Sequence, residues 1–210
     1  MRLPPQSFFA NTQTLTADKF NVLSGAIAAN PDGSISVNVS RVRTVLNQPL
    51  PGLRSINYHF QVQGDSPTVK ADSDGVTRKG VVLWADVVNA CNLVFLSCRT
   101  DDREAHGTTV IEGQLQSNPS ITGTIDNAQL NSCAGIGYSV VSKRVLNIDI
   151  MDGKEHDFLV KIDSSGFQIS LDQQSLDVPI GLLDTGLYGL RTDNVDANIM
   201  IEANTRSSFL

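Results

Sequence analysis

Short runs of strand-forming residues, separated by turn residues, recur along this chain and constrain its fold more than any other feature. In the clearest run, Ser34 to Val42, the apolar residues Ile35, Val37 and Val39 alternate with polar ones. This run follows the turn signal Pro-Asp-Gly within residues 30–33. No apolar stripe with the 3.6-residue helical period extends beyond two turns. The sequence therefore predicts an all-β fold, with a hairpin turn at 30–33.

Further strands are predicted from the same pattern. They cover Leu53 to Gln63, Lys79 to Val88, Leu93 to Arg99, Thr108 to Leu115, Val145 to Ile150, Asp157 to Ile162, Phe167 to Leu171, Leu187 to Arg191 and Asp196 to Ala203. The runs 80–88 and 93–96 are almost entirely apolar, which is typical of a sheet covered on both faces. We expect them to form the central hairpin. The polar stretches 64–78 and 100–107 are expected to be loops, where binding sites often lie.

Length and composition favour one domain. A chain of 210 residues fits a single large β-sandwich. Because only 6% of the residues are aromatic, Val, Ile and Leu must supply most of the core. We predict an extended N-terminal arm over residues 1–20, which has no core of its own, followed by one sandwich domain over 21–210. Arms of this kind commonly dock on neighbouring subunits.

The charge and the N-terminal sequence disfavour several classes of partner. The net charge of −6 gives no electrostatic footprint for a phosphate backbone, so nucleic acid is not an expected partner. Two prolines interrupt the first residues, where a Sec-type signal needs an apolar run, and no later segment suits membrane insertion. The compartment stays unknown from sequence, with a virion or cell-surface assembly favoured over the cytoplasm.

Three cysteines, Cys91, Cys98 and Cys133, form an odd set. Cys91 and Cys98 are seven positions apart, so in one unbroken strand they would point to opposite faces and could not pair. We favour buried thiols, and leave open a bridge from either residue to Cys133. A zinc site would need a fourth ligand and closer pairs.

Three segments in the last third of the chain form a recognisable pattern: Glu155 to Asp163, Ser165 to Asp172 and Gly186 to Asn194. In these segments the chain resembles the concanavalin A-like lectin and glucanase superfamily, including its LamG-like jelly rolls, mainly within residues 155–203. Ser164 and Gln173 stand where the family pattern has glycine. The resemblance implies a jelly-roll sandwich of two antiparallel sheets, one flat and one bent, with any ligand groove on the concave face.

Glycoside hydrolases of that superfamily carry an E-x-D-x-x-E strand, and the nearest string here is 147–152. Asn147 stands where the nucleophile should be, and an amide cannot serve as one. We expect Asp149 to be a solvent-facing strand residue. The three histidines show no metal-binding spacing and no nucleophile elbow is present, so no catalytic residue is assigned.

Four residues could supply hard oxygen ligands to Ca²⁺: Asp101, Asp102, Asp193 and Asn194. Each pair follows an Arg-Thr dipeptide at the predicted end of a strand. Against a bound ion stands the preference of Asp and Asn for turns at strand ends. No other cofactor is expected.

Three functions are compatible with these features. The main hypothesis is a non-enzymatic structural module that self-associates or binds assembly neighbours, as in a virus or phage particle or a surface appendage. The alternative is a carbohydrate-binding module that uses the concave face, with Tyr58, Tyr138 or Tyr188 as stacking platforms. Trp84 could also stack, but it lies in a run that reads as buried. The third hypothesis is a hydrolase or lyase of the same fold.

Overall fold

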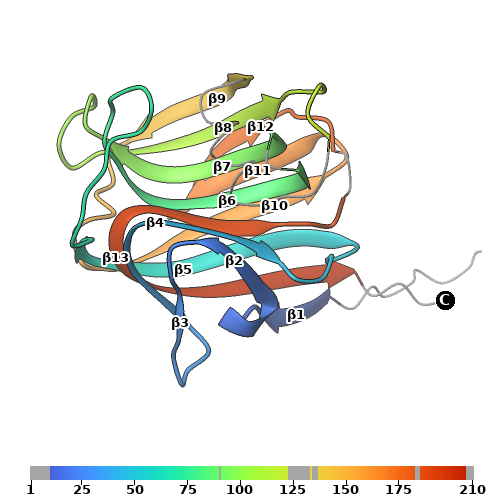
Figure 1. The fold of residues 1–210 in the computed structure, drawn as a ribbon, viewed down its shortest axis with the longest axis horizontal. Coiled ribbons are helices and arrows are strands. Elements are labelled where there is room, and N and C mark those ends of the chain that lie inside the picture. Colours follow the sequence, from blue (N-terminus) through green and yellow to red (C-terminus); the bar gives the residue numbers. More distant parts are fainter. Residues whose placement is uncertain (1–9, 90, 123–132, 134–136, 183–184, 207–210) are drawn as a thin grey trace, which may run out of the picture.

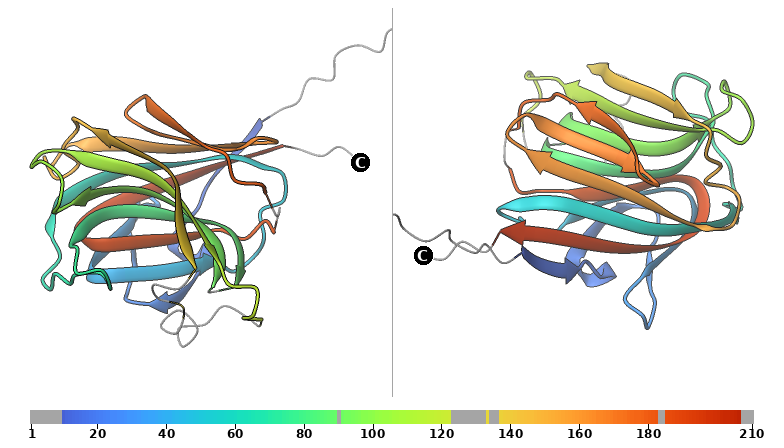
Figure 2. Two further views of the ribbon diagram at one scale, coloured as in Figure 1. Left: turned by 90° about the horizontal axis from the view of Figure 1, so that it is seen from above. Right: turned by 180° about the vertical axis from the view of Figure 1, so that it is seen from behind.

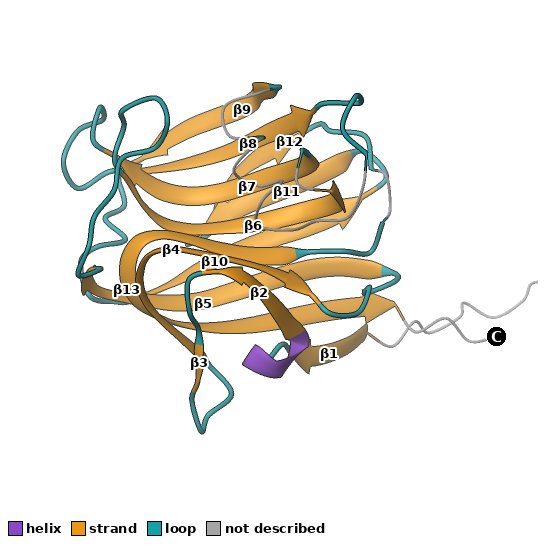
Figure 3. Ribbon diagram, viewed as in Figure 1, coloured by secondary structure: helices purple, strands orange, loops and turns teal. Residues whose placement is uncertain are grey.

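The computed structural model describes residues 10–89, 91–122, 133, 137–182 and 185–206. Figure 3 shows that strands dominate, and the helical turn η1 (Ala17–Lys19) follows β1. The strands are β1 (Ala10–Thr14), β2 (Phe20–Ser24), β3 (Ala28–Ala29), β4 (Ile35–Leu46), β5 (Leu53–Asp65), β6 (Arg78–Asn89), β7 (Asn92–Asp101), β8 (Thr109–Ser117), β9 (Tyr138–Leu146), β10 (Glu155–Asp163), β11 (Gly166–Leu171), β12 (Gln174–Val178) and β13 (Gly189–Arg206). The all-β prediction is confirmed. Among the described residues, no helix has the length and apolar character needed to cross a membrane.

The strands form two antiparallel layers that share β13. Strand β13 pairs with β6 over 189–193 and with β5 over 195–205. From β6 the first layer continues through β7 and β8 to β9, and from β5 the second continues through β10 and β11 to β12. Figure 1 shows that β13, in red, bends sharply, so that its first half lies in one layer and its second half in the other. The rear view in Figure 2 shows β10–β12 lying across from β6–β8. The predicted jelly-roll sandwich is confirmed.

The bend in β13 coincides with Asn194. This residue has a φ of 53°, a left-handed conformation that asparagine adopts more readily than most side chains. Before it, Asp193 pairs with Gly80 of the first layer; after it, Val195 pairs with Asp65 of the second. Asn194 therefore marks the point at which one strand passes from one layer to the other.

The main core lies between the layers. Its largest side chains include Phe158 and Tyr58, whose rings stack with centroids 6.2 Å apart, and both are almost fully buried. A second, smaller cluster packs on the opposite face of the first layer around Trp84 and Phe95. Strands β6 and β7 are thus covered on both faces, as their apolar sequences predict. The hairpin at 30–33 is confirmed as well, since Ala29 pairs with Ile35 across that turn.

Some predicted strands differ from the structure. The stretch predicted at 145–150 is the end of β9 followed by a turn, in which Asp149 accepts a hydrogen bond from the Met151 amide at 3.0 Å. The expectation that Asp149 lies on a strand is therefore wrong. The rest of β9, residues 138–144, was not predicted because β9 is a sheet edge with exposed apolar side chains, so it lacks the alternating pattern. The segments 187–191 and 196–203 belong largely to the one strand β13.

Part of the predicted arm joins the chain's own sandwich. Residues 1–9 lie outside the described residues, but Ala10–Thr14 forms β1 and pairs with the C-terminal half of β13. Leu15 is only 3% exposed and belongs to the main core. This apolar anchor explains why residues 10–15 dock on their own sheet.

Gly113 of β8 sets the spacing between the layers. A Cβ atom at this position would lie 2.2 Å from Cγ1 of Val178 in β12. We expect Gly113→Ala to lower the free energy of unfolding by about 1–3 kcal/mol because the added methyl overpacks the interface. Gly64→Ala is the matched control, because no atom lies within 4 Å of its new Cβ.

Urea unfolding of both variants measures this effect. Adding Val178→Ala to Gly113→Ala should recover part of the loss, since it removes the methyl groups that the new Cβ meets. Equal stability of the two glycine variants would contradict the tight packing between β8 and β12.

Candidate functional site

A hollow of about 300 Å³ opens on the face of the first layer that points away from the main core. Strands β4, β6, β7, β8, β9 and β13 and the loop 66–77 supply its walls, and we call it the arginine pocket. Its lining residues are Arg41, Arg43, Asp72, Ser73, Asp74, Arg78, Trp84, Phe95, Arg99, Gln114, Gln116, Tyr138 and Arg191. Successive strand residues point to opposite faces, so Arg41 and Arg43 reach the pocket while Val42 enters the core.

Asp193 is the anionic centre beneath the pocket. Its carboxylate is fully buried and accepts hydrogen bonds from Nε of Arg41 at 2.9 Å, Nη1 of Arg99 at 3.1 Å and Nε of Arg191 at 3.0 Å. Burial alone would raise the pKa of Asp193, but the three guanidinium groups outweigh it and hold that pKa well below its ordinary value. Asp193 therefore stays ionised and fixes three arginines in one place.

The loop 66–77 adds a second carboxylate above the same arginines. Asp72 accepts hydrogen bonds from Nη1 of Arg78 at 2.8 Å and from Nη2 of Arg191 at 3.4 Å, and it also pairs with Arg41. Two carboxylates and four arginines thus form one continuous network, to which Arg99 belongs through Asp193.

Asn194 holds this loop in position. Its Oδ1 accepts a hydrogen bond from the Lys70 amide at 2.8 Å, and its Nδ2 donates to the carbonyls of Lys70 at 2.8 Å and Arg78 at 2.9 Å. The residue at which β13 bends therefore also fastens the loop that carries Asp72.

Three aromatic side chains lie at one end of the pocket. Trp84 and Phe95 are cross-strand neighbours, and their rings meet edge to face at 6.1 Å. Phe95 also contacts Tyr138 of β9, with centroids 5.1 Å apart. Trp84 and Phe95 are buried, whereas Tyr138 is 40% exposed. Tyr138 is therefore the ring that a ligand can reach.

The cysteines stabilise the same end of the first layer. Cys91 and Cys133 form a disulfide, and Cys98 is a free, buried thiol. The favoured prediction of three buried thiols is therefore wrong, and the bridge to Cys133 that the spacing left open is present. Gln116, which lines the pocket, donates a hydrogen bond to the Cys133 carbonyl at 2.8 Å. Burial raises the pKa of Cys98, which keeps this thiol protonated.

The structure separates the three tyrosines named from the sequence. Tyr138 lines the arginine pocket. Tyr58 and Tyr188 are 1% and 4% exposed and belong to the main core, so neither ring can stack on a ligand at the surface. Tyr58 shares its inward direction with the apolar residues at alternate positions of β5, a pattern that is visible in the sequence, and Tyr188 lies just before β13.

The four residues considered for Ca²⁺ surround the same network but already have partners. Asp193 is held by arginines and Asn194 by the loop backbone, as above. Asp101 pairs with Arg103 at 2.6 Å, and Asp102 accepts a hydrogen bond from the Thr77 amide at 3.0 Å. The described residues contain no group of three His, Cys, Asp or Glu side chains suited to a metal. Ca²⁺ binding at these residues stays a prediction.

Sequence reasoning missed the arginines themselves. Arg41 and Arg43 alternate on one strand, and Arg99 and Arg191 each begin an Arg-Thr-Asp sequence within a buried stretch of strand. Charged residues at alternate positions of buried strands are a signal, because arginine is seldom buried unless it is paired. The Arg-Thr pairs were noted, but only as neighbours of the acidic residues.

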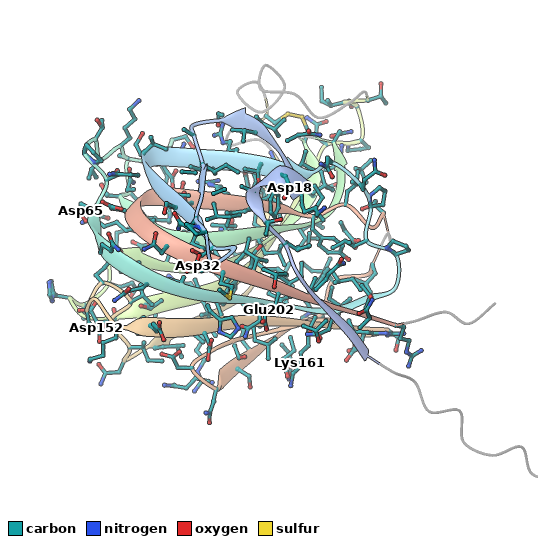
Figure 4. All side chains as sticks on the ribbon, turned by 90° about the horizontal axis from the view of Figure 1, so that it is seen from below. Asp18, Asp32, Asp65, Asp152, Lys161 and Glu202 are labelled. Carbon is teal, nitrogen blue, oxygen red and sulfur yellow. A yellow bond between two sulfur atoms is a disulfide. The ribbon has the colours of Figure 1, made fainter. Side chains whose placement is uncertain are left out.

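A second hollow lies on the outer face of the second layer. Asp32 and Glu202, both labelled in Figure 4, line it together with His59 and Gln61. His59 faces Glu202 at 3.4 Å and also pairs with Asp157. The ring of Phe60 in its wall is 1% exposed. This hollow is therefore acidic, and the described residues that line it offer no accessible Phe, Trp or Tyr ring.

Comparison with known proteins identifies the fold. No protein-family model matches the chain, and no curated protein matches its sequence. Among solved structures, the chain is similar to the carbohydrate-binding module CBM66 from Bacillus subtilis (14% identity, 86% and 91% of the two chains covered, TM-score 0.53). It is also similar to the exoplasmic/lumenal domain of VIP36 in its Ca²⁺/Man3GlcNAc-bound form (11%, 91% and 85%, 0.56) and to a Bacillus licheniformis β-glucanase (8%, 97% and 100%, 0.51). The chain therefore has the concanavalin A-like jelly-roll fold.

Proposed function

We propose that this protein is a non-enzymatic module that binds carbohydrate in the arginine pocket. The observation that carries the proposal is the exposed ring of Tyr138 beside the hydrogen-bonding side chains of Gln114, Arg43 and Arg191 in one hollow. Sugar rings present apolar C–H faces to aromatic side chains and hydroxyl groups to polar ones, and small-molecule sites combine the two in this way.

The similar structures support a sugar ligand. They include proteins named as a carbohydrate-binding module, the exoplasmic/lumenal domain of VIP36 in its Ca²⁺/Man3GlcNAc-bound form and a β-glucanase. These names belong to proteins that are at most 14% identical to this chain. They therefore support carbohydrate as the class of ligand, and they do not support a particular sugar.

The ion pairs of the pocket argue against hydrolysis. A glycosidase needs one carboxyl group that is protonated at working pH and a second that is free to attack. Here Asp193 is buried, ionised and bound by three arginines, and Asp72 is bound by arginines as well. Turnover of a polysaccharide by the purified protein would overturn the non-enzymatic part of the proposal.

The assembly-subunit hypothesis has less support than the carbohydrate-binding one. The predicted N-terminal arm is one of the features that suggest an assembly subunit, yet residues 10–14 pair with β13 of the same chain. A surface or extracellular location fits both hypotheses, and the Cys91–Cys133 disulfide supports an oxidising compartment.

A glycan array followed by calorimetry tests the proposed function. We expect binding of at least one glycan, and we expect Tyr138→Ala to weaken it roughly tenfold through loss of the stacking ring. Val145→Ala is the matched control, since it truncates another exposed apolar side chain on the same strand, outside the pocket. Absence of binding to any glycan on the array, or an equal loss of affinity in both variants, would contradict binding at this site.

A further inference from the structure

We propose that the carbohydrate bound in the arginine pocket carries an anionic group, a carboxylate or a sulfate. This inference rests on the proposed function and adds the chemical class of the ligand. It follows from three features of the described residues: the charge of the pocket, the hydrogen-bonding groups that are left over, and the size of the hollow.

The pocket gathers guanidinium groups on a protein that is negative overall. Five arginines line it, against the lining carboxylates of Asp72 and Asp74, with Asp193 beneath them and Glu112 4.0 Å from Arg99. Arg78 also pairs with Asp101 at 3.4 Å, so the pocket is close to neutral, whereas the whole chain has a net charge of −6. The negative net charge of the chain does not attract a polyanion, so any affinity for a polyanion must come from the groups in this pocket.

The hydrogen-bonding groups left over are mainly donors. The carboxylates of Asp72, Asp74 and Asp193 all accept hydrogen bonds from guanidinium groups already. Arg191 donates through Nε and Nη2, and Arg99 through Nη1. The Nη1 atom of Arg191 and the Nη2 atom of Arg99 donate no hydrogen bond to any other described residue.

Two uncharged groups add to these donors. The indole Nε1 of Trp84 is buried and has no hydrogen-bond partner within the described part of the chain. The side-chain amide of Gln114, also in the wall, makes no hydrogen bond to a described residue. A wall in which unpaired donors predominate and the carboxylates are occupied matches a ligand group that only accepts, and carboxylates and sulfates are such groups.

The pKa of Arg43 is lowered by its burial and by the neighbouring arginines. Its partial burial and the nearby charges of Arg191 and Arg41 lower its pKa to about 10, and the attraction of Asp193 does not offset them. The folded protein therefore holds Arg43 in an environment that disfavours its charge. An anion in the pocket would relieve this repulsion, which gives Arg43 a larger role in binding than in stability.

The size of the hollow limits the ligand further. At about 300 Å³ it lies at the lower end of the range of small-molecule sites, which is roughly 300–1,000 Å³. We infer that one anionic sugar unit enters the pocket, either at the end of a chain or as the charged unit of a repeating polymer.

Matched pairs of polymers test the inference by calorimetry with the full chain. Polygalacturonate and its fully methyl-esterified form differ in the carboxylate, and κ-carrageenan and its desulfated form differ in the sulfate. We expect one anionic member to bind, with its neutral counterpart at least tenfold weaker. Which pair responds identifies the anion. Neutral forms that bind as well as charged ones would overturn the inference while leaving the proposed function intact, whereas no binding to any polymer or array glycan would remove both.

Two substitutions locate the effect. Arg43→Gln should weaken binding of the anionic polymer about tenfold or more, and Arg54→Gln, the same change at an exposed position of β5, should leave it unchanged. Gln114→Glu keeps the size of a part-exposed side chain but adds a negative charge, and should abolish anionic binding. Thermal unfolding checks that each variant is folded. Equal affinity of the Gln114→Glu variant and the native protein for the anionic polymer would overturn the inference.

Discussion

Replacing Asp193 by Asn is expected to lower the free energy of unfolding by about 3–5 kcal/mol, the largest effect that we predict for one side chain. The variant keeps the shape of the residue but removes the charge that Arg41, Arg99 and Arg191 share. Removing one partner of a buried ion pair is costly because the opposite charges stay buried without compensation. Chemical denaturation at neutral pH measures the difference.

Asp157→Asn is the control for this prediction. Its carboxylate is 59% exposed and pairs with His59 at the surface of the second layer. We expect a change within about 0.5 kcal/mol, since exposed pairs contribute little. Similar losses in the two variants would contradict the central role of Asp193.

The pH dependence of stability gives an independent check. The folded state depresses the pKa of Asp193, so the stability that its charge contributes is fully present above the unfolded value of about 3.9. This contribution is lost as the pH falls from there toward the folded pKa. Stability of the native protein should therefore decline below about pH 4, and Asp193→Asn should show a shallower decline.

Removing the disulfide is expected to cost about 4 kcal/mol of unfolding free energy, nearly as much as the loss of Asp193. Cys91 and Cys133 are 42 positions apart, and closing a loop of that length restricts the unfolded chain by about this amount. The double variant Cys91→Ser and Cys133→Ser should unfold at lower denaturant concentration than the oxidised native protein. The loop between them contains β7 and β8, which form the middle of the first layer.

The reduced native protein controls for the serine substitutions. It should approach the stability of the double variant, and the oxidised native protein should stay well above both. If reduction leaves the unfolding midpoint unchanged, the loop does not depend on the disulfide for its stability. Cys98 does not complicate this comparison, because its thiol is buried and remains protonated.

The sequence predicted the fold well because the fold depends on patterns that are local. The alternation around Val37 and the apolar runs of β6 and β7 indicate which faces are buried, and they do so without knowledge of the partner strands. Most of β9 and all of β12 were not predicted. Both are edge strands, and a strand with one neighbour and an exposed face needs no strict alternation of apolar and polar residues.

The candidate site could be predicted only in part because it depends on register between distant strands. Tyr138 was named from its residue type alone, and only the pairing of β9 with β8 places it over Phe95. The arginine pocket joins Arg41, Arg99 and Arg191, which are far apart in sequence. Their proximity follows from β13 lying beside both β4 and β6, a pairing that no local pattern encodes.

The sharing of β13 between the two layers has a consequence for synthesis on the ribosome. Strands β4, β5 and β6 all pair with β13, and β13 follows the other described strands in the sequence. Until residues 189–206 leave the ribosome, the inner faces of both layers lack the strand that joins them. Completion of the sandwich therefore waits for the C-terminal strand, and the nascent chain must keep its β-edges from pairing with other chains during that interval.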